Sequence, residues 1–328
     1  MSLRVLLIKT SSLGDVIHTL PALTDAMRAL PGIQFDWIVE EAFAEIPAWH
    51  PAVKNIIPVA LRRWRKTPLS SLFGREWQKF KLQLKMTKYD LVIDAQGLVK
   101  SAWLSRLVDA PSAGYDKQSI REPLASMFYQ RHFAVSKEQH AVERIRQLFA
   151  GALNYHYPTT TGDYALQRSK FHLPENLAAD NRVVFMHGTT RADKYWPEDY
   201  WIALAKKIIA QGFCVSLPWG NEEEQQRAQR IAAASGAEVL PKLKLAELAA
   251  LLASAQAAVA VDTGLGHLTA ALDVPCISLY GPTSPLKVGA YGKSQQHLVA
   301  GDSHDMQDIA VDAVLTAILP ILQCENAL

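Results

Sequence analysis

Residues 261–272 decide the fold and read Val261-Asp262-Thr263-Gly264-Leu265-Gly266-His267-Leu268-Thr269-Ala270-Ala271-Leu272. An apolar run leads into a turn that contains glycine, and small residues suited to a closely packed helix follow it. The start of such a helix presents unpaired N–H groups and the positive end of the helix dipole. The segment therefore predicts an α/β unit whose strand-end loop can bind a diphosphate or another anion.

On both sides of this segment, apolar strand-like runs alternate with amphipathic helix-like runs. The predicted strands cover residues 4–9, 35–39, 55–59, 91–94, 182–186, 214–217, 237–240, 257–261 and 276–280. The predicted helices cover residues 16–30, 76–88, 98–108, 140–153, 201–211, 222–235, 245–254 and 265–272. Several of the strands lack polar alternation, which is typical of parallel strands covered by helices on both faces. The pattern therefore predicts two doubly wound parallel sheets with right-handed crossovers.

The alternation lapses over residues 154–174, a polar stretch that contains Pro158 and Gly162. This lapse predicts an N-terminal domain over residues 1–160 and a C-terminal domain over residues 175–307. We expect a last helix, within residues 308–328, to pack back onto the N-terminal domain. Two sheets that face each other leave a central cleft at the carboxyl ends of their strands. Ligands of α/β proteins usually bind there.

Composition excludes several classes of protein. The 328 residues are 49% hydrophobic and 20% charged, without a run of eighteen apolar residues that could span a membrane. The first residues lack the apolar stretch and cleavage site of a signal peptide, and the three cysteines are widely spaced. These features favour a cytoplasmic protein. The ten histidines form no metal-binding pair with acidic support, so no metal is expected.

Positive charge is concentrated in one stretch, although the net charge of the chain is only +2. Residues 62–88 hold nine basic residues against the single acidic residue Glu76. The basic residues are Arg62, Arg63, Arg65, Lys66, Arg75, Lys79, Lys81, Lys85 and Lys88. Such a stretch attracts phosphates of nucleic acid, lipid head groups or glycans. Because no nucleic-acid-binding motif accompanies it, we expect no nucleic-acid partner. A solvated surface is the alternative.

Two further loops carry candidate site residues. Residues 10–15 link the first predicted strand to a helix and end at Asp15, which suits either a helix cap or a catalytic group. This loop lacks the spaced glycines of a dinucleotide-binding turn and the lysine of a P-loop, which disfavours a dehydrogenase. Residues 187–197 follow another strand, and their two threonines, Arg191 and Lys194 can hold an anionic ligand.

The chain resembles the bacterial lipopolysaccharide heptosyltransferases in four segments that occur in the same order, namely residues 9–23, 93–98, 187–196 and 262–272. The similarity extends over essentially the whole chain. The resemblance is strongest to the type I members of that family, because it includes residues 62–66, 121–124 and 140–143. The resemblance implies the GT-B arrangement of two Rossmann-like domains and inversion at the anomeric carbon. It implies transfer of L-glycero-D-manno-heptose from ADP-heptose to the first Kdo of Kdo–lipid A.

The resemblance also implies roles for individual residues. Asp15 matches the catalytic base. The donor-binding positions are matched by Thr189, Thr190, Lys194, Glu224, Leu243, Asp262, Thr263, Gly264 and His267. The acceptor-binding positions are matched by Arg62, Arg63, Lys66, Arg121 and His140. Gly188 stands where alanine also occurs, and we expect no chemical consequence of that difference. No cofactor is expected, and we expect a monomer that works peripherally at the cytoplasmic face of the inner membrane.

Three other functions remain open at this stage. A related glycosyltransferase can use another nucleotide sugar or acceptor, which a panel of donors would reveal. A nucleotide-sugar epimerase can share the fold, but it releases free product without an acceptor. A module that binds polyanions is the non-enzymatic alternative, and it predicts no affinity for a nucleotide sugar.

Overall fold

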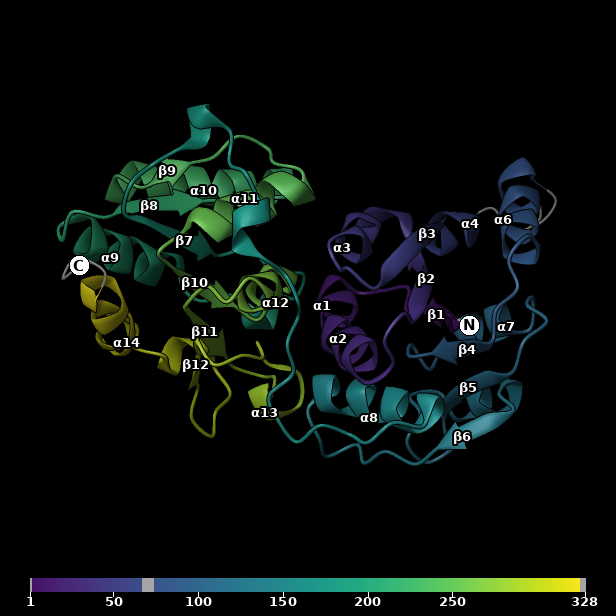
Figure 1. Cartoon of the computed structure of the whole chain (residues 1–328). Helices are drawn as coiled ribbons and strands as arrows, with labels where there is room; N and C mark the ends of the chain where they lie inside the picture. The colour runs from purple at the N-terminus through teal and green to yellow at the C-terminus, as the bar shows by residue number, and fades with distance from the viewer. Residues whose placement is uncertain (1, 67–73, 325–328) are drawn as a thin grey trace. The chain divides into compact units, whose positions relative to one another are not determined.

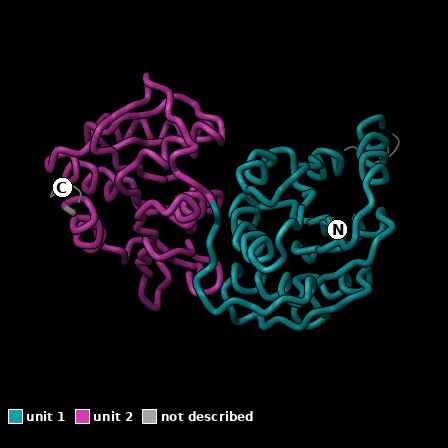
Figure 2. Tube along the Cα trace, viewed as in Figure 1, with its two compact units in different colours: residues 1–165 teal, residues 166–328 magenta. Residues whose placement is uncertain are grey.

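The computed structural model describes residues 2–66 and 74–324, and the chain divides into two compact units, Met1–Ala165 and Leu166–Leu328 (Figure 2). The division lies within residues 154–174, the stretch in which the sequence places a domain boundary. Each unit contains one six-stranded sheet (Figure 1).

The sheet of unit 1 has the strand order β3-β2-β1-β4-β5-β6, and every neighbouring pair is parallel. Its strands are β1 (Arg4–Ile8), β2 (Gln34–Glu40), β3 (Val53–Val59), β4 (Leu91–Asp94), β5 (Ser112–Tyr115) and β6 (Arg131–Phe133). The sequence predicts four of these strands but not β5 and β6, because these are short and carry no apolar run. In β5, a Cβ on Gly114 would lie 2.3 Å from the ring of Tyr129, so only glycine allows this packing.

The helices of unit 1 are α1 (Leu13–Ile17), α2 (Leu20–Ala29), α3 (Glu45–Ala48), α4 (Leu61–Trp64), α6 (Arg75–Lys85), α7 (Val99–Ser105) and α8 (Ala141–Leu153). The predicted single helix over residues 16–30 is wrong, because it is divided into α1 and α2 at His18 and Thr19. Pro21 lacks an N–H group and lies in the first turn of α2, where no helical partner is needed. A short helix, α1, therefore precedes the main one and carries Asp15.

The sheet of unit 2 has the order β12-β11-β10-β7-β8-β9 and is also parallel throughout. Its strands are β7 (Arg182–Met186), β8 (Cys214–Leu217), β9 (Glu238–Val239), β10 (Ala257–Val261), β11 (Cys276–Tyr280) and β12 (Gln295–Val299). Its helices are α9 (Glu198–Ile209), α10 (Glu222–Ser235), α11 (Leu245–Ser254), α12 (Gly264–Ala271), α13 (Pro285–Val288) and α14 (Val311–Cys324). Strand β12 is not predicted from the sequence, because it lies at the sheet edge and is mostly polar.

Six short 3₁₀ helices complete the described part of the two units. They are η1 (Glu41–Phe43), η2 (Pro123–Phe128), η3 (Arg168–Lys170), η4 (Glu175–Leu177), η5 (Ala192–Lys194) and η6 (Met306–Asp308). Of these, η5 lies in the loop after β7, which carries several predicted donor-binding residues.

The last helix, α14, belongs to the core of unit 2. Its residues Val314, Ile318 and Leu322 are fully buried in one apolar cluster with residues of α9, β10 and β11. Their spacing of four residues places them on one face of the helix. The expectation that this helix packs onto the N-terminal domain is therefore wrong: its apolar face completes the second core instead.

We expect Ile318→Ala to lower the free energy of unfolding of the second unit by about 2–5 kcal/mol, because it removes buried methyl groups and leaves a cavity. Denaturant unfolding followed by tryptophan fluorescence measures this, since Trp201 belongs to the same cluster. Thr316→Ala is the matched control on the exposed face of α14. Equal, small effects of the two substitutions would show that α14 does not support this core.

Candidate active site

All of the predicted site residues lie in segments that follow the carboxyl ends of strands. Because each sheet is parallel, these segments meet at one edge of their own sheet. In unit 1 they follow β1, β3, β5 and β6, and in unit 2 they follow β7, β8, β9 and β10. Each unit therefore gathers its own part of the predicted site.

Asp15 is held in a fixed position at the start of α1. Its Oδ2 atom accepts hydrogen bonds from the backbone N–H of Ser12 at 2.9 Å and from the Ser12 hydroxyl at 3.1 Å. Its Oδ1 atom lies 3.3 Å from the Nζ atom of Lys9. A carboxylate has about four lone-pair sites, so these contacts leave room for one more donor. The Asp15 side chain is 36% exposed, which leaves it accessible to a substrate hydroxyl.

The structure corrects the alternative role of Asp15 as a helix cap. Ser12 is the N-cap residue of α1, and Asp15 lies three positions inside the helix, where it accepts the Ser12 N–H. This contact is half of a capping box. Asparagine at position 15 can accept the same hydrogen bond, so this structural role does not require a charge.

Lys9 and Gln96 support the loop that carries Asp15. Lys9 is 5% exposed, and its Nζ atom donates to the backbone oxygen of Ala95 at 3.1 Å. The Oε1 atom of Gln96 accepts hydrogen bonds from the backbone N–H groups of Thr10, at 2.9 Å, and Ser11, at 3.0 Å. The loop after β4 therefore fixes the loop after β1.

These contacts keep Asp15 ionised. Burial acts to raise the pKa of the Asp15 carboxyl, but the Lys9 ammonium and the Ser12 hydrogen bonds outweigh it, so the pKa lies below 3.8. At neutral pH Asp15 is therefore a carboxylate, the form that a proton acceptor requires.

Two predicted acceptor-binding residues lie near the Asp15 loop. The ring of His140 packs edge-on against the ring of His18, with centroids 5.4 Å apart, and His18 follows the end of α1. Arg121 is exposed and lies beside the loop after β4, since its backbone nitrogen is 3.7 Å from the Cβ position of Gly97. Segments after β1, β4, β5 and β6 thus converge around α1.

The remaining acceptor-binding candidates form a separate group on and after α4, beyond the end of β3. The guanidinium of Arg62 lies 5.5 Å from the ring centre of Phe43. Arg63 is already engaged, because its guanidinium pairs with Glu41 at 3.2 Å and with Glu76 at 3.0 Å. The hydrogen bonds to these two carboxylates raise the pKa of Arg63, and the bond to Glu41 has the larger effect. Lys66 is exposed.

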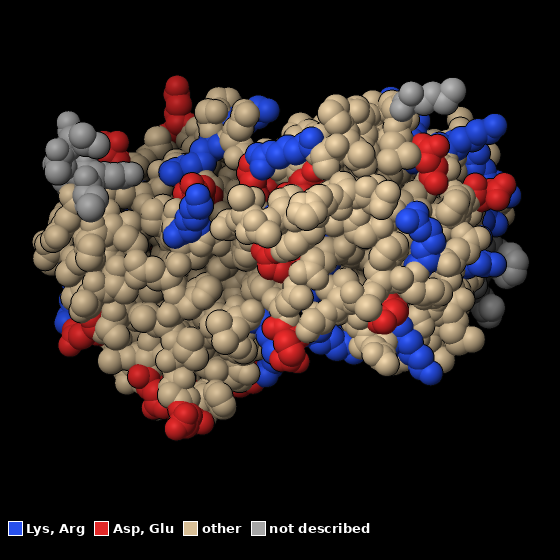
Figure 3. Space-filling model, turned by 60° about the horizontal axis from the view of Figure 1, so that its bottom comes forward, with Lys and Arg blue, Asp and Glu red and all other residues tan. Residues whose placement is uncertain are grey.

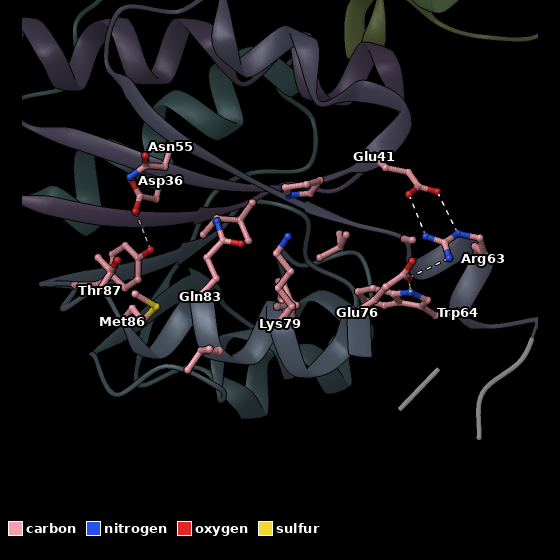
Figure 4. A pocket seen from close by; sticks show the side chains of 17 residues that line it. Asp36, Glu41, Asn55, Arg63, Trp64, Glu76, Lys79, Gln83, Met86 and Thr87 are labelled. Atoms are coloured by element: carbon pink, nitrogen blue, oxygen red, sulfur yellow. Dashed lines mark hydrogen bonds and ion pairs between the residues drawn. The ribbon is translucent and has the colours of Figure 1, made fainter. Parts of the chain in front are cut away.

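This group borders a cavity of about 760 Å³ between β3 and α6. Figure 4 shows Arg63 between Glu41 and Glu76 at one end of the cavity, while Lys79 and Gln83 point into it from α6. The cavity is open to a ligand, yet its polar lining includes Asp36, whose carboxylate is already bound by Arg4, Asn55 and Tyr89.

In unit 2, Asp262 is the centre of the predicted donor site. Its Oδ2 atom lies 2.6 Å from the Nζ atom of Lys194 and accepts a 2.7 Å hydrogen bond from the hydroxyl of Thr283. The hydroxyl of Thr189 donates to the backbone oxygen of Asp262 at 3.3 Å. Lys194 and Asp262 are 15% and 10% exposed, so the ion pair is mostly shielded from water.

The start of α12 lies directly beside this ion pair in the chain. Thr263 is the N-cap residue, and its side chain makes no capping hydrogen bond within the described part of unit 2. The first backbone N–H groups of the helix, those of Gly264 and Leu265, are therefore suited to an anionic ligand, whereas the N–H of Gly266 donates to the Thr263 carbonyl at 3.1 Å. His267 lies in the next turn and is 8% exposed. Thr190, on the neighbouring loop, is exposed.

Glu224 also reaches this edge of the sheet. Its Oε2 atom accepts the backbone N–H of Gly220 at 2.7 Å. A Cβ on Gly188 would lie 2.7 Å from the Glu224 carboxyl carbon, so alanine there would displace the Glu224 side chain. Leu243 is half-buried in the loop after β9.

Sequence reasoning missed three residues that organise the site: Lys9, Gln96 and Thr283. Gln96 and Thr283 lie in strand-end segments that the sequence does reveal, but their partners are distant in the chain. Lys9 ends an otherwise apolar strand, and a buried lysine of this kind is the one signal that could have identified it.

Within residues 2–66 and 74–324, no cluster of three histidine, cysteine or acidic side chains could hold a metal ion. Within the same ranges, no helix combines the length and the apolar character that a membrane span requires.

Comparisons with known proteins agree with this geometry. Residues 77–315 match the glycosyltransferase family 9 (heptosyltransferase) model. The chain is 61% identical to lipopolysaccharide heptosyltransferase 1 of Pseudomonas aeruginosa over 298 residues, which are 90% of this chain and 83% of that protein. It is 54% identical to the Escherichia coli K12 protein of the same name, covering 89% and 92% of the two chains.

Solved structures show the same relation. The E. coli heptosyltransferase WaaC with ADP superimposes with a TM-score of 0.91 at 50% identity, over 97% of this chain and all of the other. WaaC with ADP-2-deoxy-2-fluoro heptose gives 0.88 at 51% identity, over 96% and 99% of the two chains. With two parallel α/β units and these matches, the chain belongs to glycosyltransferase family 9, the heptosyltransferases.

Proposed function

We propose that the chain transfers L-glycero-D-manno-heptose from ADP-heptose to the first Kdo of Kdo–lipid A during synthesis of the lipopolysaccharide inner core. The Asp15 site carries this proposal: an accessible carboxylate is kept ionised by a buried lysine. The lipopolysaccharide heptosyltransferases 1 of Pseudomonas aeruginosa and Escherichia coli K12 are 61% and 54% identical to it over 298 and 297 aligned residues, which supports the choice of sugar and acceptor.

The proposed reaction is a single displacement. Asp15 takes the proton of a Kdo hydroxyl, and the hydroxyl oxygen attacks the anomeric carbon of heptose from the face opposite ADP. The new C–O bond forms as the bond between the sugar and the diphosphate breaks, which inverts the anomeric centre. Negative charge grows on the departing ADP, and Lys194 and the N–H groups at the start of α12 offset it.

The donor-binding edge of unit 2 offers the chemistry that a nucleoside diphosphate sugar requires. Lys194 has three N–H donors, so it can contact a phosphate while it keeps its bond to Asp262. Asp262, Glu224 and the threonines at 189 and 190 supply hydrogen-bonding groups for sugar and ribose hydroxyls. We propose no role for a metal or another cofactor, so transfer should continue in excess EDTA.

We further propose that the acceptor is held by unit 1 and that the enzyme works as a monomer at the cytoplasmic face of the inner membrane. Arg62, Lys66 and Arg121 are exposed cations at the edge of the sheet that carries Asp15. Cations of this kind suit the carboxylates of Kdo and the phosphates of lipid A.

Incubation with ADP-heptose and Kdo–lipid A, followed by detection of ADP, tests the whole proposal; no ADP release would refute it.

Asp15→Asn should lower turnover by about 10²–10⁴-fold, because asparagine keeps the Ser12 hydrogen bond but cannot take a proton. This corresponds to about 3–5 kcal/mol of activation free energy. ADP affinity should be unchanged. Because the pKa of Asp15 lies below 3.8, the carboxylate stays ionised at neutral pH, and its protonation can reduce kcat/KM of the free enzyme only at lower pH.

Glu247→Gln is the matched control for this variant. Glu247 also lies three positions inside a helix and accepts the backbone N–H of the N-cap residue, Lys244, at 2.6 Å. The Glu247→Gln substitution should leave turnover unchanged. Near-normal turnover of Asp15→Asn on Kdo–lipid A would remove Asp15 from catalysis.

Lys194→Ala should weaken ADP binding by about ten- to hundredfold and also lower kcat, because it removes a charge-assisted contact to the diphosphate. Calorimetric titration with ADP and steady-state kinetics measure the two effects. Lys206→Ala, an exposed lysine of α9, is the control. If ADP affinity and turnover both stayed normal, Lys194 would not belong to the donor site.

Arg62→Gln should raise the acceptor KM by about two- to tenfold and leave ADP affinity unchanged, since exposed ion pairs are weak. The effect should shrink at 1 M salt, where the Debye length is about 3 Å. Arg63→Gln is less clean, because it also breaks the ion pairs with Glu41 and Glu76. A parallel loss of ADP affinity in Arg62→Gln would contradict the assignment to the acceptor.

A further inference from the structure

Helix α6 has two unlike faces. Trp77, Phe80 and Leu84 are buried in the core of unit 1. On the opposite side, Leu82 and Met86 are 59% and 79% exposed. These two residues are four positions apart and therefore lie next to each other, one turn apart, on the helix surface. Two adjacent exposed apolar side chains need a partner more than scattered single ones do.

The residues around this apolar pair are basic. Arg75, Lys85 and Lys88 are all exposed, and together with Leu82 and Met86 we call them the α6 surface. Glu76 offsets them only in part: its carboxylate accepts hydrogen bonds from Arg63 at 3.0 Å and from the Trp64 indole at 3.1 Å, and Arg63 also pairs with Glu41. In Figure 3, several lysine and arginine side chains, with acidic ones between them, lie at the end of unit 1 that carries α6 in Figure 1.

We propose that the α6 surface docks on an anionic phospholipid bilayer. Lysine and arginine are attracted to acidic head groups while their stems extend along apolar surface. Leu82 and Met86 can then enter the boundary between head groups and acyl chains. A nucleic acid would bind the cations but leave both apolar side chains in water. A second copy of the chain in a two-fold arrangement would set like charges against each other.

The α6 surface also lies beside the proposed acceptor-binding group. The Arg63–Glu76 ion pair joins α4 to α6, and Trp64 packs edge-on against Trp77 with ring centres 5.6 Å apart. On the other side, Trp77 stacks on Trp103 of α7 at 5.5 Å. Docking through α6 would therefore hold Arg62 and Lys66 near the membrane, where a lipid-linked acceptor presents its sugars. In this respect the inference rests on the proposed function.

Co-sedimentation with vesicles tests the docking of the full chain. One set of vesicles is phosphatidylcholine alone, and the other is phosphatidylcholine mixed with phosphatidylglycerol; neither contains an acceptor. We expect binding to the anionic vesicles only, and we expect it to weaken as salt is raised. Absence of binding to the anionic vesicles at low salt would overturn the inference.

Two double variants separate the apolar and electrostatic contributions. Leu82→Gln with Met86→Gln should weaken vesicle binding at least about tenfold, because glutamine keeps the helix but cannot enter the apolar layer. Lys85→Gln with Lys88→Gln should weaken it by about fivefold for each lysine. Circular dichroism and thermal unfolding should match the wild type, because all four side chains are exposed.

Matched controls are available in unit 2. Leu286 and Val288 are 81% and 41% exposed, and Leu286→Gln with Val288→Gln should bind vesicles as the wild type does. Lys206→Gln with Lys293→Gln is the control for charge, since both lysines are exposed. Equal losses in the controls and in the α6 variants would overturn the inference, because binding would then depend only on overall charge and apolarity.

Two further measurements distinguish competing outcomes. A dimer in sedimentation that is lost in Leu82→Gln with Met86→Gln would overturn docking in favour of self-association. Transfer to a short-chain, water-soluble acceptor should be normal in the α6 variants. If the wild-type chain does not bind vesicles but still transfers heptose to the soluble acceptor, the docking inference fails and the proposed function stands. If wild-type transfer itself is absent, the proposed function fails, whatever the vesicles show.

Discussion

The loop geometry of unit 1 depends on one buried carboxylate, Asp94, at the end of β4. It accepts hydrogen bonds from the hydroxyls of Tyr129 at 2.7 Å and Ser101 at 2.8 Å and from the backbone N–H of Gln96 at 2.8 Å. Burial raises the pKa of Asp94, although these hydrogen bonds oppose the rise. A buried carboxylate is tolerated only with such partners, so it fixes the turn that follows it. Gln96 in that turn then holds the backbone before Asp15.

Unit 2 places an aspartate at the corresponding point. Asp262 directly follows β10, as Asp94 ends β4, and both strands are paired on both sides within a parallel sheet. The two carboxylates nevertheless differ in their partners. Asp94 binds neutral donors, whereas Asp262 binds the ammonium of Lys194. The first arrangement shapes a loop, and the second places a cation where a diphosphate can reach it.

Much of this could be predicted from the sequence, because parallel strands read as apolar runs and their loops must share one edge. That rule locates the candidate site residues that follow predicted strands. Arg121 and His140 follow β5 and β6 instead, and only the family resemblance indicated them. Short or polar strands such as β5, β6 and β12 could not be predicted, since their pairing depends on neighbours distant in the chain. The packing of α14 was mispredicted for a similar reason: its apolar face fits any core, and only the tertiary structure selects unit 2. The contacts of Lys9 and Thr283 likewise join distant segments.

The lysine–aspartate pairs at the two candidate sites are shielded in opposite ways, which suits their different proposed tasks. In Lys9–Asp15 the lysine is buried and the carboxylate is exposed, so the group that meets solvent is the one able to accept a proton. In Lys194–Asp262 both partners are mostly buried, so neither charge is left unpaired before a ligand arrives. A phosphate can add to the remaining N–H donors of Lys194 without breaking the pair. Each unit therefore holds its reactive charge in place through a partner of opposite sign, and burial decides which of the two charges a substrate can reach.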